Sequence, residues 1–219
     1  MMETKPKRIP LHRRIRRKRH GEIAVAQDIA VEVLYSAFPR GVLHGGTAIW
    51  RCYSGNRFSE DIDVYIGRDI GKIDRFFEAL NKRGFEVVKK RVKENALYST
   101  LKFGEAEIRI EAIFKRVRGV IKEYETYEGN LLNVYTLTPE AMVCEKIDAY
   151  LKRRKIRDLY DIFFLLRYAE KSKRLRSKLS NFLQNFKQPV DEKELKTLLL
   201  FGAIPSKEDM LEYIKRWAR

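Results

Sequence analysis

The sequence predicts an α+β fold in which a mixed β-sheet flanked by helices is followed by a C-terminal helical bundle. Residues 85–118 alternate apolar and polar side chains with a period of two, which is typical of strands with one buried face. Beyond residue 138 the apolar side chains recur every three or four positions, which indicates amphipathic helices. We therefore expect a sheet domain over residues 21–135 and a helical domain over residues 136–219.

A basic arm is expected over residues 1–20. From Lys5 to Arg19, nine of the fifteen residues are Lys or Arg, and blocks of like charge repel one another and stay unfolded on their own. We expect this arm to be flexible and to order on a phosphate backbone, against the alternative of a solvated tail.

The sheet domain opens with a helix over residues 22–38, where apolar residues recur at helical spacing until Pro39. The elements that follow are a strand over 41–44, a glycine turn, a short helix, a strand at the D-x-D pair, a helix over 71–82, and strands over 85–90, 98–103 and 106–114. The helices expected after them cover residues 139–153, 157–168, 171–187, 191–200 and 206 onward. Thr138 before Pro139, and the capping boxes Asp191–Glu194 and Ser206–Asp209, mark three of these helix starts.

Two carboxylates in a D-x-D pattern are the first candidate site. Asp61 and Asp63 lie two residues apart on a predicted strand, so both side chains project from the same face. Carboxylates at such close range repel each other unless a cation lies between them, and Mg²⁺ prefers oxygen ligands and substrate phosphates. Upstream, Gly45 and Gly46 would let a phosphate approach the backbone at the start of a helix, where anions are favoured. The combination predicts metal-assisted nucleotidyl transfer.

Two segments resemble a known family. The stretch HGGTAIWRCYSGNRFSEDIDVYI (residues 44–66) resembles the first motif of the AbiEii/AbiGii toxin family, which belongs to the DNA polymerase β-like nucleotidyltransferase superfamily. The segments EKIDAY (residues 145–150) and RDLYDI (residues 157–162) resemble the helical lysine motif of that family and its R-D-x-x-D element. Both matches occur in the expected order, and they imply a nucleotidyltransferase-type sheet and an enzyme of that class.

The resemblance implies three catalytic carboxylates. Asp61 and Asp63 would hold one or two Mg²⁺ ions, for which Mn²⁺ could substitute, together with a nucleoside triphosphate. Glu111 is the candidate for the third carboxylate, because it lies between apolar residues on a predicted strand and matches the strand position of the family. It would bind the metal or deprotonate the acceptor hydroxyl. Glu107, on the same strand face, is the second candidate.

The nucleotide itself is expected to contact the glycine turn and the two downstream motifs. The predicted nucleotide-binding residues are Gly45, Gly46, Thr47, Arg57, Ser59, Lys146, Arg157, Asp158 and Asp161. Lys146 would clamp the triphosphate, with a solvated side chain as the alternative. Asp158 and Asp161 would bind the nucleotide or hold Lys146 in place, and an Asp-capped helix start with an intrahelical Arg–Asp pair remains open. Arg57 would contact the nucleotide or the acceptor, and Ser59 would contact phosphate or cap its turn.

The formal net charge of +16 favours a polyanionic partner. RNA, tRNA in particular, is therefore the expected acceptor, and a protein hydroxyl is the second option. The family resemblance implies the toxin of a toxin–antitoxin pair, with a cognate antitoxin as partner. Two other functions remain open: a non-catalytic protein that binds nucleic acid or nucleotide on the same fold, and a kinase-like transfer of a terminal phosphate.

Several classes of protein are not expected. The sequence holds no apolar run of transmembrane length and no apolar stretch after the basic arm, so we expect no membrane partner, no secretory signal and a cytoplasmic location. Cys52 and Cys144 lack a C-x-x-C partner and are expected to be buried free thiols rather than zinc ligands. His44, beside the glycine turn, is expected to be structural or near the substrate. The Tyr and Phe residues lie at core spacing and predict no base-stacking surface.

Overall fold

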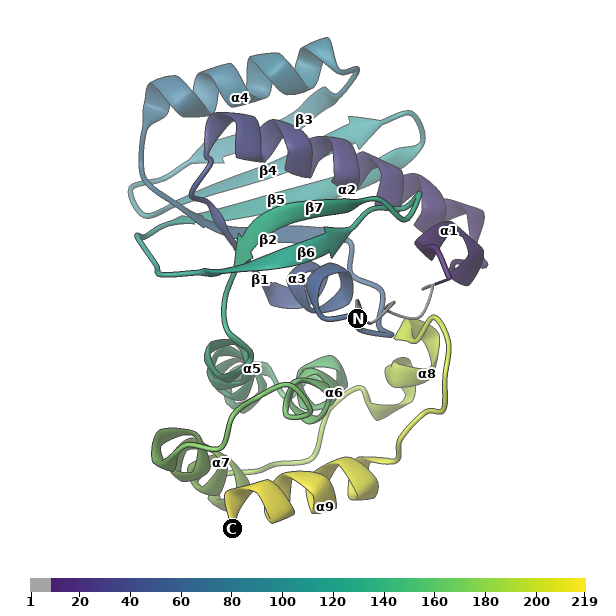
Figure 1. The fold of residues 1–219 in the computed structure, drawn as a ribbon, viewed down its shortest axis with the longest axis vertical. Helices are drawn as coiled ribbons and strands as arrows, with labels where there is room; N and C mark the ends of the chain where they lie inside the picture. The colour runs from purple at the N-terminus through teal and green to yellow at the C-terminus, as the bar shows by residue number, and fades with distance from the viewer. Residues whose placement is uncertain (1–8) are drawn as a thin grey trace, which may run out of the picture.

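A seven-stranded mixed sheet forms the upper part of the computed structural model, which describes residues 9–219 (Figure 1). The strand order is β3-β4-β5-β2-β1-β7-β6, and the β2–β5 and β1–β7 pairs are parallel while the other neighbours are antiparallel. The strands are β1 (Val42–His44), β2 (Asp61–Ile66), β3 (Glu86–Val92), β4 (Ala96–Phe103), β5 (Ala106–Phe114), β6 (Val120–Glu125) and β7 (Leu131–Thr136).

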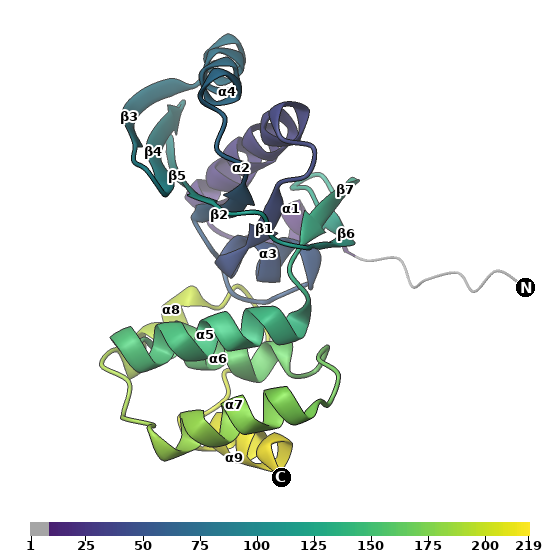
Figure 2. The ribbon, with the colours of Figure 1, turned by 90° about the vertical axis from the view of Figure 1, so that its left-hand side faces the viewer.

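Helices cover one face of the sheet, and a short helix closes its lower end. In the first half of the chain the helices are α1 (Leu11–Arg14), α2 (Lys18–Ala37), α3 (Gly45–Cys52) and α4 (Ile70–Lys82). The pair α2 and α4 packs side by side against β5 and β3, and α3 lies between the sheet and the helices below it (Figures 1 and 2). Strand β2 buries Ile62, Val64 and Ile66, so the alternate side chains, including Asp61 and Asp63, project from the opposite face.

The second half of the chain is helical. Its helices are α5 (Pro139–Arg153), α6 (Ile156–Leu165), α7 (Lys173–Gln184), α8 (Leu195–Leu198) and α9 (Lys207–Ala218), with a 3₁₀ turn at Glu192–Glu194 before α8. Thr138 caps α5 by accepting a hydrogen bond from the Ala141 amide, and Ser206 and Asp209 form the expected capping box of α9. The α+β prediction, with a mixed sheet followed by a helical region, is confirmed.

The two halves of the chain are joined by backbone hydrogen bonds as well as by packing. The amide of Phe58 donates to the carbonyl of Leu198, and the amide of Leu200 donates to the carbonyl of Asn56, so the segment after α8 pairs with the loop before β2. This loop carries part of the first motif, so residues late in the sequence fix the position of residues that precede the D-x-D strand.

The structure differs from the sequence-based expectation at the N-terminal arm and in the second half of the sheet. Residues 9–20 are folded: Leu11 is buried, Arg14 pairs with Glu125 of β6, and α2 begins at Lys18. The part of the expected flexible arm at residues 1–8 lies outside the described residues. Strands β6 and β7 were not predicted, because β6 is an edge strand whose first four residues are exposed and show no alternation.

One helix cap also differs. Asp191 does not cap its own helix, and its carboxylate accepts a hydrogen bond from the Ile156 amide at 2.7 Å and lies 3.3 Å from the Lys155 ammonium. It therefore satisfies the N-terminus of α6, where the flanking residue Lys155 has no side-chain acceptor.

Candidate functional site

Three adjacent strands bring two of the predicted carboxylates together. Asp63 on β2 lies beside Glu111 on β5, and on its other side it lies beside His44 on β1. Because neighbouring strands are about 4.8 Å apart, these three side chains form one row across the sheet. Asp61 lies in the next row, opposite Arg109. Glu107 lies beyond the start of β2, since the ladder begins at the Asp61–Arg109 pair, so the structure places Glu111 rather than Glu107 beside the D-x-D pair.

Asp63 and Glu111 are not paired with a cationic side chain of the described residues. Neither carboxylate forms a hydrogen bond or an ion pair with any of residues 9–219. Burial raises the pKa of Asp63, an effect that His44 and Lys146 oppose. Burial also raises the pKa of Glu111, and the negative charges of Asp63 and Asp61 raise it further. Two adjacent carboxylates that destabilise each other's charged form are the environment that a bound cation would relieve.

Asp61 is held differently. Both of its carboxylate oxygens accept hydrogen bonds from Arg109, at 2.7 and 3.1 Å. In the described part of the chain, no three His, Cys, Asp or Glu side chains are arranged to ligate one metal ion, so the expected triad is not assembled. The unpaired oxygens of Asp63 and Glu111 fit Mg²⁺ chemically, and Asp61 would join them once Arg109, whose side chain is 55% exposed, turns into solvent.

The glycine turn lies directly against this site. Gly45 has φ +70°, and a Cβ atom added there would lie 1.9 Å from Oδ2 of Asp63. A Cβ atom on Gly46 would lie 2.4 Å from Oγ of Ser59. Both positions require glycine for space, and Gly45 also requires it for its backbone conformation. Helix α3 begins at Gly45, so its positive N-terminal end lies beside Asp63.

The other residues of the first motif have different surroundings. Thr47 is buried and its hydroxyl donates to the Asp61 carbonyl at 2.5 Å, so it braces the turn against β2. Gln27 of α2 also contacts this turn, donating to the Ser59 carbonyl at 2.9 Å. The Ser59 hydroxyl forms no hydrogen bond with the described residues and is half-buried beside Gly46. Of these hydroxyls, that of Ser59 is free to contact a phosphate.

A buried network of ion pairs joins the first motif to the second. Asp161 accepts two hydrogen bonds from Arg57, at 2.8 and 2.9 Å, and its Oδ2 lies 2.7 Å from the Lys146 ammonium. Asp158 accepts two from Arg153, at 2.7 and 2.8 Å, and lies 3.8 Å from Lys146. Burial alone would raise the pKa of Asp161, but the charges of Arg57 and Lys146 outweigh it and hold that pKa below its ordinary value.

The residues of the R-D-x-x-D element differ in burial and in their ion-pair partners. Asp158 and Asp161 are fully buried, and both lie against Lys146. The alternative of an intrahelical Arg–Asp pair does not occur for Asp158, because its partner Arg153 lies on the preceding helix. Arg157 is half-buried, is the second residue of α6, and forms no ion pair with the described residues.

Sequence analysis missed several residues around the carboxylates. Glu145 accepts a hydrogen bond from the Tyr65 hydroxyl at 2.7 Å and lies 3.2 Å from Nδ1 of His44, whose ring stacks on Tyr65. Two cations were also missed: Arg109, which bonds to Asp61, and Arg153, which belongs to the buried network of ion pairs. Arg109 could have been found, because it shares a strand face with Glu111, and Glu145 directly precedes Lys146 in the motif. Nothing in the sequence pairs Arg153 with Asp158.

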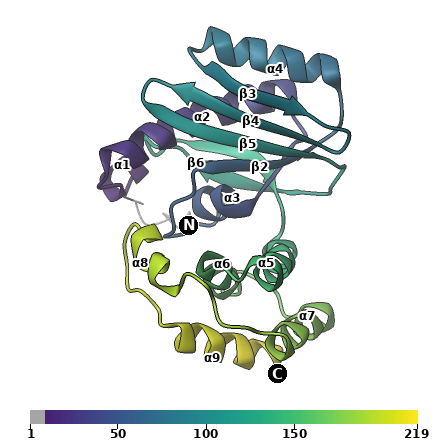
Figure 3. The same ribbon diagram turned by 180° about the vertical axis from the view of Figure 1, so that it is seen from behind.

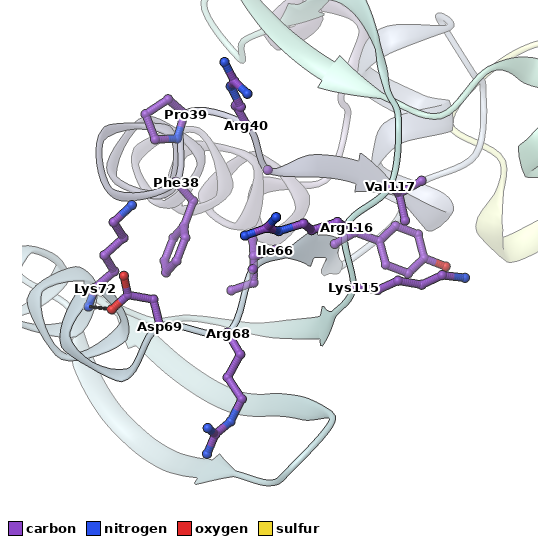
Figure 4. Close-up of a pocket in the computed structure, with 13 residues that line it drawn as sticks. Phe38, Pro39, Arg40, Ile66, Arg68, Asp69, Lys72, Lys115, Arg116 and Val117 are labelled. Carbon is purple, nitrogen blue, oxygen red and sulfur yellow. Dashed lines mark hydrogen bonds between the residues drawn. The ribbon is translucent and has the colours of Figure 1, made fainter.

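A large cavity lies away from the carboxylates. It has a volume of about 700 Å³ and lies near the last residues of β2, with Phe38 and Ile66 among its lining residues (Figure 4). Five cationic residues line it without forming an ion pair to the described residues: Arg40, Arg68, Lys72, Lys115 and Arg116. Its carboxylate, Asp69, accepts a hydrogen bond from the Lys72 amide as the cap of α4. None of the predicted site residues lines this cavity.

The part of the chain that the structure describes contains no helix that is both long and apolar enough to cross a membrane.

Comparisons with known proteins identify the family of the chain and its fold. Residues 32–217 match the family model described as nucleotidyl transferase AbiEii toxin, type IV toxin–antitoxin system. No curated protein matches the chain. Among solved structures, JHP933 from Helicobacter pylori is similar with a TM-score of 0.65 and 19% identity, over 92% of this chain and 91% of that one.

Two further solved structures share the fold. A putative nucleotidyltransferase from H. pylori has a TM-score of 0.65 and 21% identity, over 93% of this chain and 94% of that one. MenT4, the nucleotidyltransferase toxin Rv2826c from Mycobacterium tuberculosis, has a TM-score of 0.56 and 18% identity, over 90% of this chain and 86% of that one.

Proposed function

Because this chain belongs to the nucleotidyl transferase AbiEii toxin family, we propose that it transfers a nucleoside monophosphate from a nucleoside triphosphate to RNA, tRNA in particular. The reaction depends on Mg²⁺, and the protein acts as a toxin that a cognate antitoxin controls. One observation carries the proposal: Asp63 and Glu111 are adjacent carboxylates without a cation partner, and Asp63 lies against the glycine turn at the start of α3.

In this reaction the acceptor hydroxyl oxygen attacks the α-phosphorus, the bond from that phosphorus to the β-phosphate oxygen breaks, and pyrophosphate leaves. Glu111 lies on the side of Asp63 away from the glycine turn, where it accepts the proton of the acceptor hydroxyl. Asp61, Asp63 and Glu111 would hold Mg²⁺, which would supply charge neutralisation for the transfer.

The remaining residues bind and orient the triphosphate. The amides at the N-terminus of α3 favour an anion, and the absence of a side chain at Gly45 and Gly46 lets a phosphate reach them. The free Ser59 hydroxyl donates to the phosphate. Lys146 contributes a compact positive charge, and Asp161 holds it in position.

A labelling experiment tests the proposal. Purified protein is incubated with Mg²⁺, total tRNA and each α-³²P-labelled nucleoside triphosphate, and products are separated by gel. Asp63→Asn is expected to reduce label on RNA to below about 1%, since several kcal/mol of charge stabilisation depend on this carboxylate. The matched control is Asp148→Asn, the same change at an exposed position on α5.

Other outcomes separate the alternatives. Label on protein instead of RNA would identify a protein hydroxyl as the acceptor. Transfer of γ-label without α-label would indicate kinase-like chemistry. Absence of label with every nucleotide would overturn the proposal in favour of a non-catalytic binding protein, although such a protein gains nothing from two adjacent unpaired carboxylates.

A further inference from the structure

We propose that the open face of β3, β4 and β5 binds the acceptor RNA strand, with Tyr98 stacking on the base next to the reacting hydroxyl. This inference rests on the proposed function and adds to it the surface along which the acceptor approaches. The face carries a cavity of about 300 Å³ that Glu111 itself helps to line. No helix of residues 9–219 covers this side of the three strands, as Figure 3 shows.

The register of the ladders places Tyr98 next to the reaction site. Tyr98 on β4 pairs with Glu111 on β5, and Arg91 on β3 pairs with Tyr98. Together with Asp63 these residues form one row across four strands. Side chains directly opposite each other in such ladders have Cβ atoms about 5 Å apart. A base stacked on Tyr98 would therefore place its ribose within reach of Glu111.

The direction of approach follows from what lies on each side of Asp63. The glycine turn and the start of α3 directly follow β1, so they occupy the β1 side of Asp63, where we place the nucleoside triphosphate. The attacking and leaving groups of an in-line displacement lie on opposite sides of the phosphorus. The acceptor therefore enters from the β5 side, and the surface on that side is the face of β5, β4 and β3.

The side chains on this face suit a single-stranded nucleic acid. Lys89 and Arg91 lie two residues apart on β3 and project from the open face. Lys93 directly follows β3 and lines the same cavity, and none of the three forms an ion pair with a described residue. Tyr98 is 40% exposed, and the Lys93 ammonium lies 5.5 Å from its ring centroid. A line of free cations beside an exposed aromatic ring is the combination that binds backbone phosphates and stacks bases without reading their sequence.

The larger basic cavity near the last residues of β2 is less suited to this role. Tyr65, the aromatic residue that borders it toward the site, is half-buried and has one face stacked on His44. The cavity therefore offers cations but no exposed aromatic ring beside a catalytic carboxylate. It provides the matched control, because three of its five unpaired cations can be replaced at another place on the same protein (Figure 4).

Binding without turnover is the test. The full chain is titrated into a 5′-fluorescein single-stranded RNA in EDTA, and fluorescence anisotropy is measured over a series of salt concentrations. Replacing Lys89, Arg91 and Lys93 together by Gln is expected to lower the slope of log K against log salt by about 2, because each phosphate contact in a single strand contributes about 0.7. The control replaces Arg40, Arg68 and Lys115 by Gln and is expected to leave most of that slope.

Tyr98 gives an independent signature. Tyr98→Ala is expected to weaken RNA binding by about 5- to 150-fold, the value of one base–aromatic stack, without changing the salt slope. Tyr98→Phe, which keeps the ring, is expected to restore binding. Far-ultraviolet circular dichroism of each variant checks that the surface substitutions leave the fold intact.

Each outcome decides the inference separately from the proposed function. RNA binding that depends on Tyr98 and the β3 cations supports this surface even if no nucleotide is transferred. Equal losses in the β3 variant and in its control would show an effect of net charge alone and overturn it. Unchanged RNA binding in the β3 and Tyr98 variants would also overturn it. The inference would likewise fail if the protein bound an acidic protein rather than RNA and these variants abolished that binding.

Discussion

Two groups of cations in this molecule have opposite surroundings. Arg57, Lys146 and Arg153 lie between the sheet and the helical domain, and each is bonded to a carboxylate of α6. Lys89, Arg91 and Lys93 lie on the open face of β3, and none is bonded to a carboxylate of the described residues. The first group is therefore held in place by the protein's own carboxylates, while the second has no such partner and is free to bind an anion from outside. A charge of +16 gives no indication of this division.

The largest effect on stability is expected when the buried cations lose a carboxylate partner. Asp161→Asn leaves the buried Arg57 and Lys146 without their carboxylate, and removing one partner from a buried ion pair costs about 3–5 kcal/mol. The free energy of unfolding, measured by urea denaturation at neutral pH, should fall by this amount. A loss below about 1 kcal/mol would mean that the network contributes little to stability, and the contrast between the two groups would fail.

A smaller effect is expected when the free energy of unfolding is measured as a function of pH, because the Asp161 carboxylate of the buried network titrates in acid. The pKa of Asp161 is lowered on folding by Arg57 and Lys146. Its contribution is therefore fully present above the ordinary carboxyl pKa of 3.8 and is lost as the pH falls through the lowered value. Unfolding free energies measured from pH 7 downward should decline more steeply for the unchanged protein than for Asp161→Asn. Parallel curves would contradict the assignment.

Arg109 is intermediate between the groups, because it is paired with Asp61 but exposed. Arg109→Gln frees the Asp61 carboxylate, and an exposed ion pair contributes only about 0.2–1 kcal/mol. The variant should therefore bind Mn²⁺ up to about five-fold more tightly, as measured by electron paramagnetic resonance without nucleotide. Weaker Mn²⁺ binding would show that Arg109 supports the carboxylate site rather than competing with the ion.

The smallest effect is expected at an exposed pair. Asp148 bonds to Lys178 at 2.6 Å, and the Asp148 side chain is 64% exposed. Asp148→Asn should change the free energy of unfolding by at most about 0.5 kcal/mol, because solvent screens such pairs. The measurement is the same urea titration as for Asp161→Asn. A change as large as in that variant would indicate that burial does not separate the two kinds of ion pair.

The sequence predicted those features that depend on local pattern. The period of side chains along β4 and β5, the Thr138 and Ser206 caps, and the glycine turn are each encoded within a few neighbouring residues, and each occurs in the structure. Strand β6 could not be predicted in this way, because an edge strand that is polar on most of its length has no hydrophobic period.

The arrangement of charges depends on pairing between distant segments, and here the sequence was insufficient. The pairing of Arg57 with Asp161 joins two motifs that are far apart in the chain, and both were identified as nucleotide-binding candidates without any sign that they bind each other. Tyr98 was assigned to core spacing, yet it lies on the exposed face of β4 beside Glu111. Strand register, which a single sequence does not specify across β3, β4 and β5, decides its position.

The hydrogen bonds that join residues 56–58 to residues 198–200 have a consequence for protein synthesis. A ribosome delivers the chain from its N-terminus, so Asn56 and Phe58 lack these backbone partners until residues 198–200 have emerged. Asp161 likewise emerges long after Arg57. The proposed site is therefore completed only when most of the chain has been made, and a nascent chain that stalls earlier lacks the contacts that hold its first motif in place.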